Sequence, residues 1–427
     1  MMEPREAIVA ASDVDVVIVG AGAAGLSAAR ATTTRGLSFH LLEASPRIGG
    51  RAYTREFIPG MPFDLGCHWM HSASLNPFVA IADRFGFRYQ KGEPWSGNIY
   101  AGNCWLTKET EQEILALAEA DEAAIAAAAA RGQDLAVAEV VDRQSRWAPF
   151  LAYWFTLSTS RDMDQVSIAD AVAAEDTGVD WPLRDGFGAL LARWAADIPV
   201  TLDTPVTRVR WGKAGVAAKT AKGSVTGRRL LITVSTNILA SGRIAFDPPL
   251  PAWKRDAAAG LPLGSYQRIG IMLTHDPFGP DALPHATVMP AGDETPLTVF
   301  LRPFGLDYVV GLTAGRFAAA LERAGRAASV DYLAERLVKT FGGGIRKAFS
   351  RRSLVSAWDS DPWILGAYSA ATPGNRHSRE ALARPVEDVL FFAGEATSPN
   401  FFDSCHGAYL SGIAAIDDIA KSTRTAA

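Results

Sequence analysis

The stretch that decides the fold of this chain is VVIVGAGAAGLSAAR, residues 16–30. A strand is predicted over Val14–Gly20, because its residues are mostly β-branched and apolar, as in strands buried on both faces. A glycine-rich turn follows directly, and a helix is predicted over Leu26–Arg35, where Gly36 ends it. A second strand, Leu37–Leu42, completes a compact β-α-β unit.

The glycines of this unit have the spacing of a dinucleotide-binding turn. Gly20 permits a tight turn, Gly22 lets the backbone approach a pyrophosphate, and Gly25 lets the helix pack closely on the strand. The helix N-terminus offers N–H groups and a positive dipole to the phosphates. Glu43 can accept hydrogen bonds from ribose hydroxyls, which disfavours NADP and leaves NAD and FAD open. The segment Arg-Ile-Gly-Gly-Arg at residues 47–51 adds a second close approach and two cations for a pyrophosphate.

The length and composition are those of a soluble globular protein. With 427 residues, the chain is long enough for about two to three domains. Apolar residues make up 48% and charged residues 21%, which excludes disorder, collagen and coiled coil as descriptions of the whole chain. The net charge of −4 gives no reason to expect a nucleic acid or an anionic membrane as partner.

The cysteines and the N-terminus indicate the cellular setting. Cys67, Cys104 and Cys405 are widely spaced and form no Cys-x-x-Cys pair, so neither a disulfide framework nor a metal site is predicted. A reducing, cytoplasmic setting therefore fits best. The sequence predicts no signal peptide and no transmembrane helix, because the N-terminus is acidic and no apolar run is long enough to cross a membrane.

The remaining sequence predicts two interleaved domains. Residues 109–146, rich in Glu, Ala and Leu, are expected to be helical, and Pro248–Pro251 to be a linker. Further strands are predicted at Val206–Trp211, Val216–Thr220, Ser224–Val234, Tyr266–Leu273, Leu297–Leu301, Tyr308–Leu312, Ser353–Trp358 and Val389–Ala393, and further helices at Arg316–Ala324, Val330–Phe341 and Gly407–Ile419. The N-terminal unit is too small to stand alone. The strand ending at Leu230–Val234 and the C-terminal strand are its expected sheet partners.

Five motifs, which cover nearly the whole chain, resemble the flavin-dependent amine oxidase family, which includes monoamine and polyamine oxidases. The motifs are VVIVGAGAAGLSAAR at 16–30 with LLEASPRIGGR at 41–51, DLGCHWMH at 64–71 followed by Asn76-Pro77, LPLGSYQRIGI at 261–271, WDSDPWILGAYS at 358–369 and FFAGEATSPNFFDSCHGAYLSGI at 391–413. They occur in the family's order. The last motif is most similar to the polyamine-oxidase branch.

The resemblance implies an α/β fold in which a Rossmann-like FAD-binding domain is interleaved with an α+β substrate-binding domain. The FAD-binding domain would comprise residues 1–79, 201–250 and 381–427, and the substrate-binding domain residues 80–200 and 251–380. The residues expected to contact FAD are Gly20, Gly22, Ala24, Gly25, Glu43, Ala44, Gly50, Arg51, Gly66, Cys67, His68, Trp69, Val206, Gly394, Glu395, Cys405 and Ala408. Ala367 stands where monoamine oxidases carry the flavin-linking cysteine, so the resemblance implies noncovalent FAD.

The implied reaction removes the equivalent of a hydride from the carbon next to the substrate nitrogen. The flavin accepts it, water hydrolyses the imine, and oxygen reoxidises the flavin and forms hydrogen peroxide. The protein must therefore hold the amine neutral, aligned and away from bulk water, which a desolvated aromatic pocket can do. The expected partners are a small-molecule amine and oxygen, and a homodimer is compatible with the sequence.

Aromatic residues of the last two motifs are the candidates for the pocket. By resemblance, Tyr368 matches one wall of the family's two-ring amine cage. Trp363 is a second candidate, for which a core position is an equally good explanation. The partner ring of monoamine oxidases would fall at Ser404, which cannot serve, so Phe401 or Phe402 is expected to supply the other wall.

Two further residues are predicted to act in catalysis by the same resemblance. His71 matches the histidine that reaches the substrate amine region in polyamine oxidases. Arg268 stands where the family usually has a lysine that holds a water against flavin N5. An arginine stays charged at any working pH, and it can hold a water or bind a substrate carboxylate. Tyr266, Arg268 and Gly270 share one face of a strand, so Arg268 points to the flavin only if that face does.

Three alternatives to an amine oxidase stay open at this point. The first is a dehydrogenase or desaturase that passes its electrons to an acceptor other than oxygen, because Arg268 replaces the lysine that is thought to assist the reaction with oxygen. The second is an amino-acid oxidase that uses Arg268 for the carboxylate, and the third is a flavin-binding scaffold with an inactive site. The motifs do not name the substrate, although acidic residues such as Glu93 could attract a polyamine.

Overall fold

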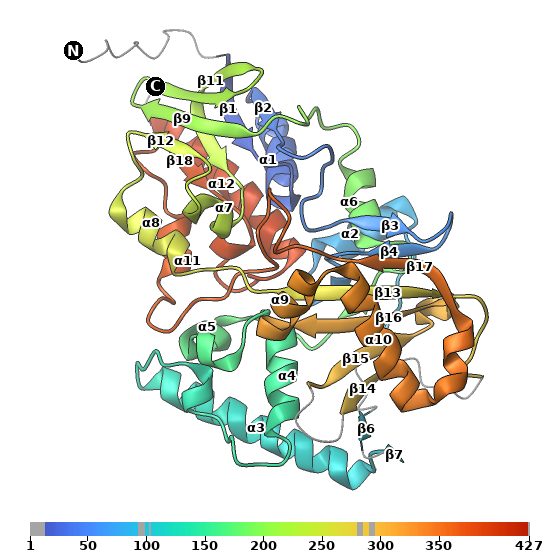
Figure 1. Cartoon of the computed structure of the whole chain (residues 1–427). Coiled ribbons are helices and arrows are strands. Elements are labelled where there is room, and N and C mark those ends of the chain that lie inside the picture. Colours follow the sequence, from blue (N-terminus) through green and yellow to red (C-terminus); the bar gives the residue numbers. More distant parts are fainter. Residues whose placement is uncertain (1–12, 93–98, 102–103, 280–284, 290–294, 426–427) are drawn as a thin grey trace.

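The computed structural model describes residues 13–92, 99–101, 104–279, 285–289 and 295–425. Two main β-sheets lie in different parts of the molecule, and helices cover both (Figure 1). The predicted class, an α/β fold with a Rossmann-like part and a second mixed sheet, is confirmed.

The first sheet is assembled from the N-terminal unit, the middle of the chain and the C-terminal region. Its strands are β1 (Val14–Val19), β2 (Phe39–Leu42), β9 (Val206–Gly212), β10 (Gly215–Thr220), β11 (Gly223–Ile232), β12 (Ala245–Asp247) and β18 (Leu390–Phe392). They lie in the order β12-β9-β10-β11-β1-β2, with β18 beside β11. Strand β1 pairs in parallel with β2 and β11, and β18 pairs in parallel with β11. The expected sheet partners of the N-terminal unit are therefore confirmed.

Both faces of this sheet are buried at β1, which explains the continuous apolar run of that strand. Ile18 packs in a core with α1 (Ala23–Thr34) and α12 (Cys405–Thr425). The next residue along, Val19, packs in the core of the opposite face. Three short helices contribute to that second core, namely α7 (Thr236–Ala240), α8 (Ala252–Ala259) and α11 (Ser378–Ala383).

The second sheet is mostly antiparallel. Its strands, in spatial order, are β17 (Phe349–Val355), β13 (Tyr266–Leu273), β16 (Tyr308–Ala314), β15 (Leu297–Leu301), β14 (His285–Met289), β6 (Ile99–Ala101) and β7 (Cys104–Trp105). Helix α10 (Arg326–Phe341) packs on it through Leu333 and Leu337, with α9 (Gly315–Ala324) beside it. The helices α3 (Lys108–Ala130), α4 (Ala148–Thr159) and α5 (Ile168–Ala173) lie at the bottom of Figure 1.

Short elements connect the two sheets around the site. They are β3 (Thr54–Glu56), β4 (Pro62–Asp64), β5 (Trp69–Met70), α2 (Pro77–Phe85), β8 (Trp181–Pro182) and α6 (Phe187–Trp194). Strand β3 pairs with β4, and β5 pairs with β8. The loop between β4 and β5, which carries the motif at 64–71, is thereby fixed at both ends.

Some element boundaries differ from the predictions. The helix expected over 109–146 ends at Ala130, because Gly132 adopts a positive φ of 74°, and the next helix begins only at Ala148. The strand expected over Ser353–Trp358 is β17, which lies several residues earlier because it pairs with β13. Within the described ranges, none of the helices is long and apolar enough to cross a membrane.

Candidate active site

A cavity of about 680 Å³ is lined by residues of both sheets. It extends from the turn after β1, past the start of α12, to Tyr266 and Arg268 on β13. Of the predicted site residues, the cavity lining includes Gly20, Gly22, Ala24, Glu43, Ala44, Gly50, Arg51, Gly66, Cys67, His68, Trp69, His71, Val206, Arg268, Trp363, Tyr368, Gly394, Glu395, Phe401, Phe402, Ser404, Cys405 and Ala408. Gly25 is absent from this lining. A Cβ there would lie 1.8 Å from the Gly20 carbonyl oxygen, so Gly25 serves the packing of helix on strand.

Glu43 is fixed by the backbone at the glycine-rich turn. Its two carboxylate oxygens accept hydrogen bonds from the amides of Ala21, at 2.6 Å, and Ser45, at 2.8 Å. The turn itself is held to the neighbouring segment, because the amide of Gly49 donates to the carbonyl of Ala21 at 2.8 Å. The carboxylate therefore stands at the cavity before any ligand binds.

The turn fits a pyrophosphate-containing cofactor. Gly22 is the cap residue of α1, and a Cβ added there would meet no atom within 4 Å, so the backbone borders open space. Among the residues that the structure describes, no side chain caps this helix, and its first turn holds no acidic residue, so its N–H groups are available to an anion. Arg47 lies nearby, with its guanidinium 3.9 Å from the centroid of the Tyr53 ring.

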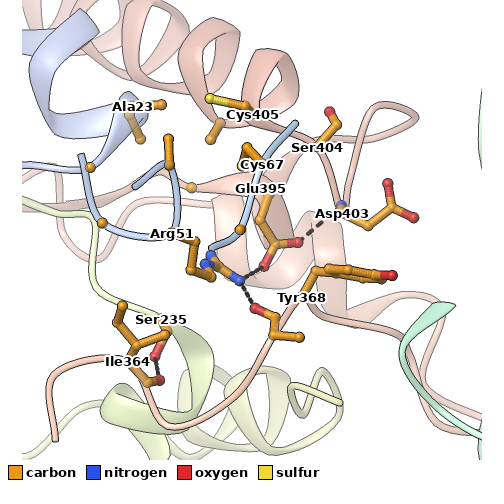
Figure 2. Close-up of a pocket in the computed structure, with 18 of the residues that line it drawn as sticks. Ala23, Arg51, Cys67, Ser235, Ile364, Tyr368, Glu395, Asp403, Ser404 and Cys405 are labelled. Carbon is orange, nitrogen blue, oxygen red and sulfur yellow. Dashed lines mark hydrogen bonds and ion pairs between the residues drawn. The ribbon is translucent and has the colours of Figure 1, made fainter. Parts of the chain in front are cut away.

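Arg51, which is partly exposed, and the buried Glu395 form a polar junction in the cavity wall (Figure 2). The Arg51 guanidinium lies 3.1 Å from the Glu395 carboxylate and also donates to the Ala367 carbonyl. The other Glu395 oxygen accepts from the Ser369 hydroxyl at 2.7 Å and from the Asp403 amide at 3.1 Å. With both oxygens engaged, Glu395 fixes three loops relative to one another.

A buried ion pair extends this junction away from the cavity. Arg379 and Asp170 are joined by two hydrogen bonds of 2.6 and 2.7 Å, and their side chains are 0% and 1% exposed. Arg379 also donates to the Ser369 hydroxyl at 3.1 Å. Its guanidinium lies 3.6 Å from the centroid of the Phe402 ring, so a cation–π interaction supports this aromatic residue of the cavity wall.

The N-terminus of α12 is capped by the residue that precedes it. The Ser404 hydroxyl accepts a hydrogen bond from the Gly407 amide at 3.0 Å and donates to the Phe401 carbonyl at 2.7 Å. It therefore caps the helix rather than offering a group to a substrate. A Cβ at Gly407 would lie 1.7 Å from the Phe401 carbonyl oxygen, so this position requires glycine. Cys67 and Cys405, which also line the cavity, are both free thiols.

Aromatic rings form the wall around Tyr368. Its ring centroid lies 5.9 Å from that of Tyr266, and its hydroxyl donates to the Leu157 carbonyl. Burial raises the pKa of Tyr266 to about 12 and that of Tyr368 well above its ordinary value, so both phenols are neutral. Phe401 and Phe402 both line the cavity, whereas Trp363 is 39% exposed.

Arg268 is buried and fixed. Its side-chain Nε donates to the Asp64 carbonyl at 2.8 Å, and its backbone amide donates to the Ser356 hydroxyl at 2.8 Å. The neighbouring Gln267 points the other way and bonds the carbonyl of Ser356. Tyr266 and Arg268 thus present the same face of β13 to the cavity, as the alternation of a strand requires.

His71 lies in an acidic part of the cavity. Its Nδ1 is 3.2 Å from the Asp180 carboxylate, and its side chain is 49% exposed. Burial lowers the pKa of His71, but the hydrogen bond and charge of Asp180 outweigh it, and the net pKa is raised. Burial also raises the pKa of Asp403 to about 8 and lowers that of His406 to about 4.

Several lining residues were not found by the sequence predictions. Glu175, Asp176 and Asp180 belong to one loop and line the cavity with Asp403. Three acidic residues within six positions were a signal for this loop. The acidic residue singled out instead, Glu93, lies outside the described residues. Trp154, Leu157 and Leu312 also line the cavity, from α4 and β16, and nothing in their local sequence distinguishes them from core residues.

Comparison with known proteins identifies a family of flavin enzymes and a dinucleotide-binding domain. Residues 127–420 match the family model of flavin-containing amine oxidoreductases, and residues 18–85 match an NAD(P)-binding Rossmann-like domain. Polyamine oxidase 4 of Oryza sativa subsp. japonica is 29% identical over 454 residues, covering 96% of this chain and 89% of that protein. Lysine-specific histone demethylase 2 of Homo sapiens is 25% identical and covers 95% of this chain and 53% of that protein.

Solved structures share the fold over nearly the whole chain. Putrescine oxidase bound to putrescine has a TM-score of 0.79 at 20% identity and covers 96% of this chain and 99% of that chain. Cyclohexylamine oxidase from Brevibacterium oxydans has a TM-score of 0.80 at 21% identity and covers 96% of this chain and 100% of that chain. At these identities the likeness establishes the fold.

Proposed function

The chain belongs to the family of flavin-containing amine oxidoreductases, and from this premise we propose that its substrate is an amine with a second cationic group, such as a diamine or polyamine. It oxidises amines with a flavin cofactor. We further propose that oxygen is the electron acceptor and that hydrogen peroxide is formed.

The observation that carries the substrate proposal is the acidic lining of the cavity. Glu175, Asp176 and Asp180 line it, whereas Asp403, whose pKa burial raises to about 8, is mostly protonated at neutral pH. The hydrogen bond and charge of His71 oppose the burial of Asp180 and leave the pKa of that carboxyl below its usual range, so Asp180 is charged. Carboxylates in a partly desolvated cavity attract a second ammonium group more strongly than they would in bulk water.

The residues that would hold FAD are those of the glycine-rich turn, Glu43, Arg51 and the start of α12. Glu43 would accept hydrogen bonds from ribose hydroxyls, the α1 N-terminus would hold phosphates, and the α12 N-terminus would stabilise negative charge on the cofactor. Bound FAD supplies the acceptor for the hydride equivalent. We propose that it is held without a covalent bond, because Ala367 offers no thiol.

The chain's own residues prepare the amine for oxidation. The rings of Tyr266 and Tyr368 exclude water from one end of the cavity, and both phenols are neutral. Exclusion of water lowers the pKa of a bound ammonium and favours the neutral amine that reacts. Arg268 cannot accept a proton, but its fixed positive charge in the cavity lining would disfavour an ammonium bound near it and so favour the neutral amine further.

An amino-acid oxidase is the second candidate, and the observation in its favour is the buried guanidinium of Arg268 in the cavity lining. Its Nε is already engaged by the Asp64 carbonyl. The acidic loop would also repel a substrate carboxylate. These two features make the polycationic amine the better supported substrate.

The test is an anaerobic bleaching screen of the purified yellow protein. Putrescine and spermidine are expected to bleach the flavin faster than benzylamine, which has a single amine, and faster than amino acids. On admission of air, the flavin should reoxidise with one peroxide formed per amine. Faster bleaching by amino acids would overturn the substrate proposal, and bleaching without peroxide would overturn the oxidase proposal in favour of a dehydrogenase.

The setting of the enzyme is also a proposal. The free thiols of Cys67 and Cys405 are compatible with the reducing cytoplasm. We expect a small-molecule substrate and oxygen as partners, and we leave a homodimer as an expectation that gel filtration can test.

A further inference from the structure

Asp64, the last residue of β4, anchors two cavity residues at once. Its carboxylate lies 2.8 Å from Nδ1 of His68, and its carbonyl oxygen accepts the Nε–H of Arg268 at 2.8 Å. The carboxylate also accepts from the Thr54 hydroxyl and from the amides of Phe187 and Gly188 at the start of α6. Asp64 is 2% exposed. Two separate segments, β3 and the start of α6, therefore hold the Asp64 carboxylate, and Asp64 in turn positions the side chains of His68 and Arg268.

The contact with Asp64 decides the tautomer of His68. A carboxylate that already accepts several N–H and O–H bonds can only accept from Nδ1, so Nδ1 carries the proton. Among the described residues, Asp64 is the only hydrogen-bond partner that the structure gives to the His68 ring. The ring lines the cavity, with its side chain 11% exposed. Nε2 therefore has a lone pair for which the described part of the chain offers no hydrogen-bond donor.

The surroundings keep this imidazole neutral. Burial is the largest influence and lowers the pKa of His68, and the charge of Arg268 lowers it further. The hydrogen bond and charge of Asp64 act in the opposite direction, and His71 adds a second positive charge that lowers it again. At neutral pH the ring is accordingly an uncharged base that faces the cavity.

We infer that His68 is the catalytic base that takes the proton from the bound substrate ammonium, and that Asp64 is the residue that positions it. This inference rests on the proposed function. The N–H bond of the ammonium breaks, the proton passes to Nε2, and the nitrogen keeps the electron pair as a neutral amine. The resulting imidazolium is stabilised by the Asp64 carboxylate and returns its proton to water.

Other groups of the cavity are less suited to this step. Arg268 stays protonated, and Tyr266 and Tyr368 are neutral phenols with raised pKa values. His71 is paired with Asp180, and its raised pKa favours the protonated imidazolium, which cannot accept a further proton.

A first experiment measures anaerobic flavin bleaching by putrescine as a function of pH. His68→Gln should lower the bleaching rate about 100-fold at pH 7, the scale of a general base. The loss should shrink to within about threefold near pH 10, where the amine arrives neutral without help from a base. His275→Gln is the matched control, because His275 bonds Thr274 outside the cavity. A rate unchanged at pH 7, or lowered equally at all pH values, would overturn the inference.

A second experiment needs no substrate turnover, and it uses only the wild-type protein, so it does not depend on whether a variant folds. In the FAD-bound wild-type protein labelled with ¹⁵N-histidine, nitrogen chemical shifts distinguish the tautomers of the seven histidines. One ring should be neutral with its proton on Nδ1 at pH 7 and should stay neutral below pH 6.5. If every ring is either charged or protonated on Nε2 at pH 7, the inference fails. Because this readout is independent of any substrate, it separates a failure here from a failure of the proposed function.

Discussion

The two halves of the cavity are built in different ways. Around the glycine-rich turn, the backbone shapes the cavity. Backbone amides hold the Glu43 carboxylate, Gly22 leaves room for a ligand, and Gly25 leaves room for the close packing of α1. Around Tyr368, side chains from distant segments do the work, from α4, β13 and the acidic loop of residues 175–180. The first half can therefore bind one type of cofactor, whereas the second can change its specificity by changing single side chains.

The sharpest test of this contrast is a methyl group on the cofactor side. Gly25→Ala should leave the purified protein essentially without FAD, because the added Cβ would lie 1.8 Å from the Gly20 carbonyl oxygen and separate α1 from β1. Flavin absorbance per polypeptide measures the effect. Gly344→Ala, where a Cβ meets nothing within 4 Å, is the control and should bind FAD normally. A Gly25→Ala protein that still binds FAD would show that the backbone at this turn tolerates a Cβ.

The next largest effect should arise at the junction of the two halves. Arg379→Met removes the two short hydrogen bonds of buried Asp170 and leaves Arg376, 3.9 Å away, as its remaining cation, which should cost about 3 kcal/mol of unfolding free energy. Urea unfolding measures it. The exposed pair of Arg346 and Glu335 is the control, and Arg346→Met should cost about 1 kcal/mol or less. Equal losses in the two variants would mean that the junction does not hold the halves together.

A smaller effect is expected from the acidic loop. Asp180→Asn should raise the KM for putrescine about tenfold, equivalent to about 1.4 kcal/mol, while the KM for benzylamine changes little. The reason is that only the diamine carries a second ammonium group for this carboxylate. Asp164→Asn is the control, because Asp164 pairs with Arg316 away from the cavity. If both substrates weaken equally, the loop acts on the fold rather than on specificity.

The smallest effect is the pH dependence of the pair formed by His71 and Asp180. His71 has a raised pKa, so its contribution to stability is complete below 6.5 and is lost as the pH rises through the folded value. Asp180 has a lowered pKa, so its contribution is complete above 3.8 and is lost as the pH falls through the folded value. His71→Gln should therefore destabilise the protein most between pH 3.8 and 6.5, as measured by thermal unfolding. A stability difference that grows above pH 7 would contradict the pairing.

The same contrast explains how far the sequence could predict this molecule. The β1–α1–β2 unit and its sheet partners were predictable because local motifs and periodicity specify them, whereas most residues expected to contact FAD were named by resemblance and are found in the cavity lining. Gly25 has the packing role that its place in the glycine-rich turn predicts, but it is not among the residues that line the cavity. The pocket of Trp154, Leu157 and the acidic loop was not predicted, because the local sequence does not record which distant segments meet. Ser404 shows the same limit: its position was found, but only the structure reveals that its hydroxyl caps α12.

The composition of the first sheet has a consequence for protein synthesis. Strand β18 and helix α12 supply the last pieces of the cofactor site, at residues 390–408, whereas the glycine-rich turn is made within the first 25 residues. During translation, the N-terminal β-α-β unit must wait for almost the entire chain before its sheet is complete. The cofactor site is therefore complete only after residues 390–408 have been made, whereas the edge of β1 needs protection only until β11, residues 223–232, can pair with it.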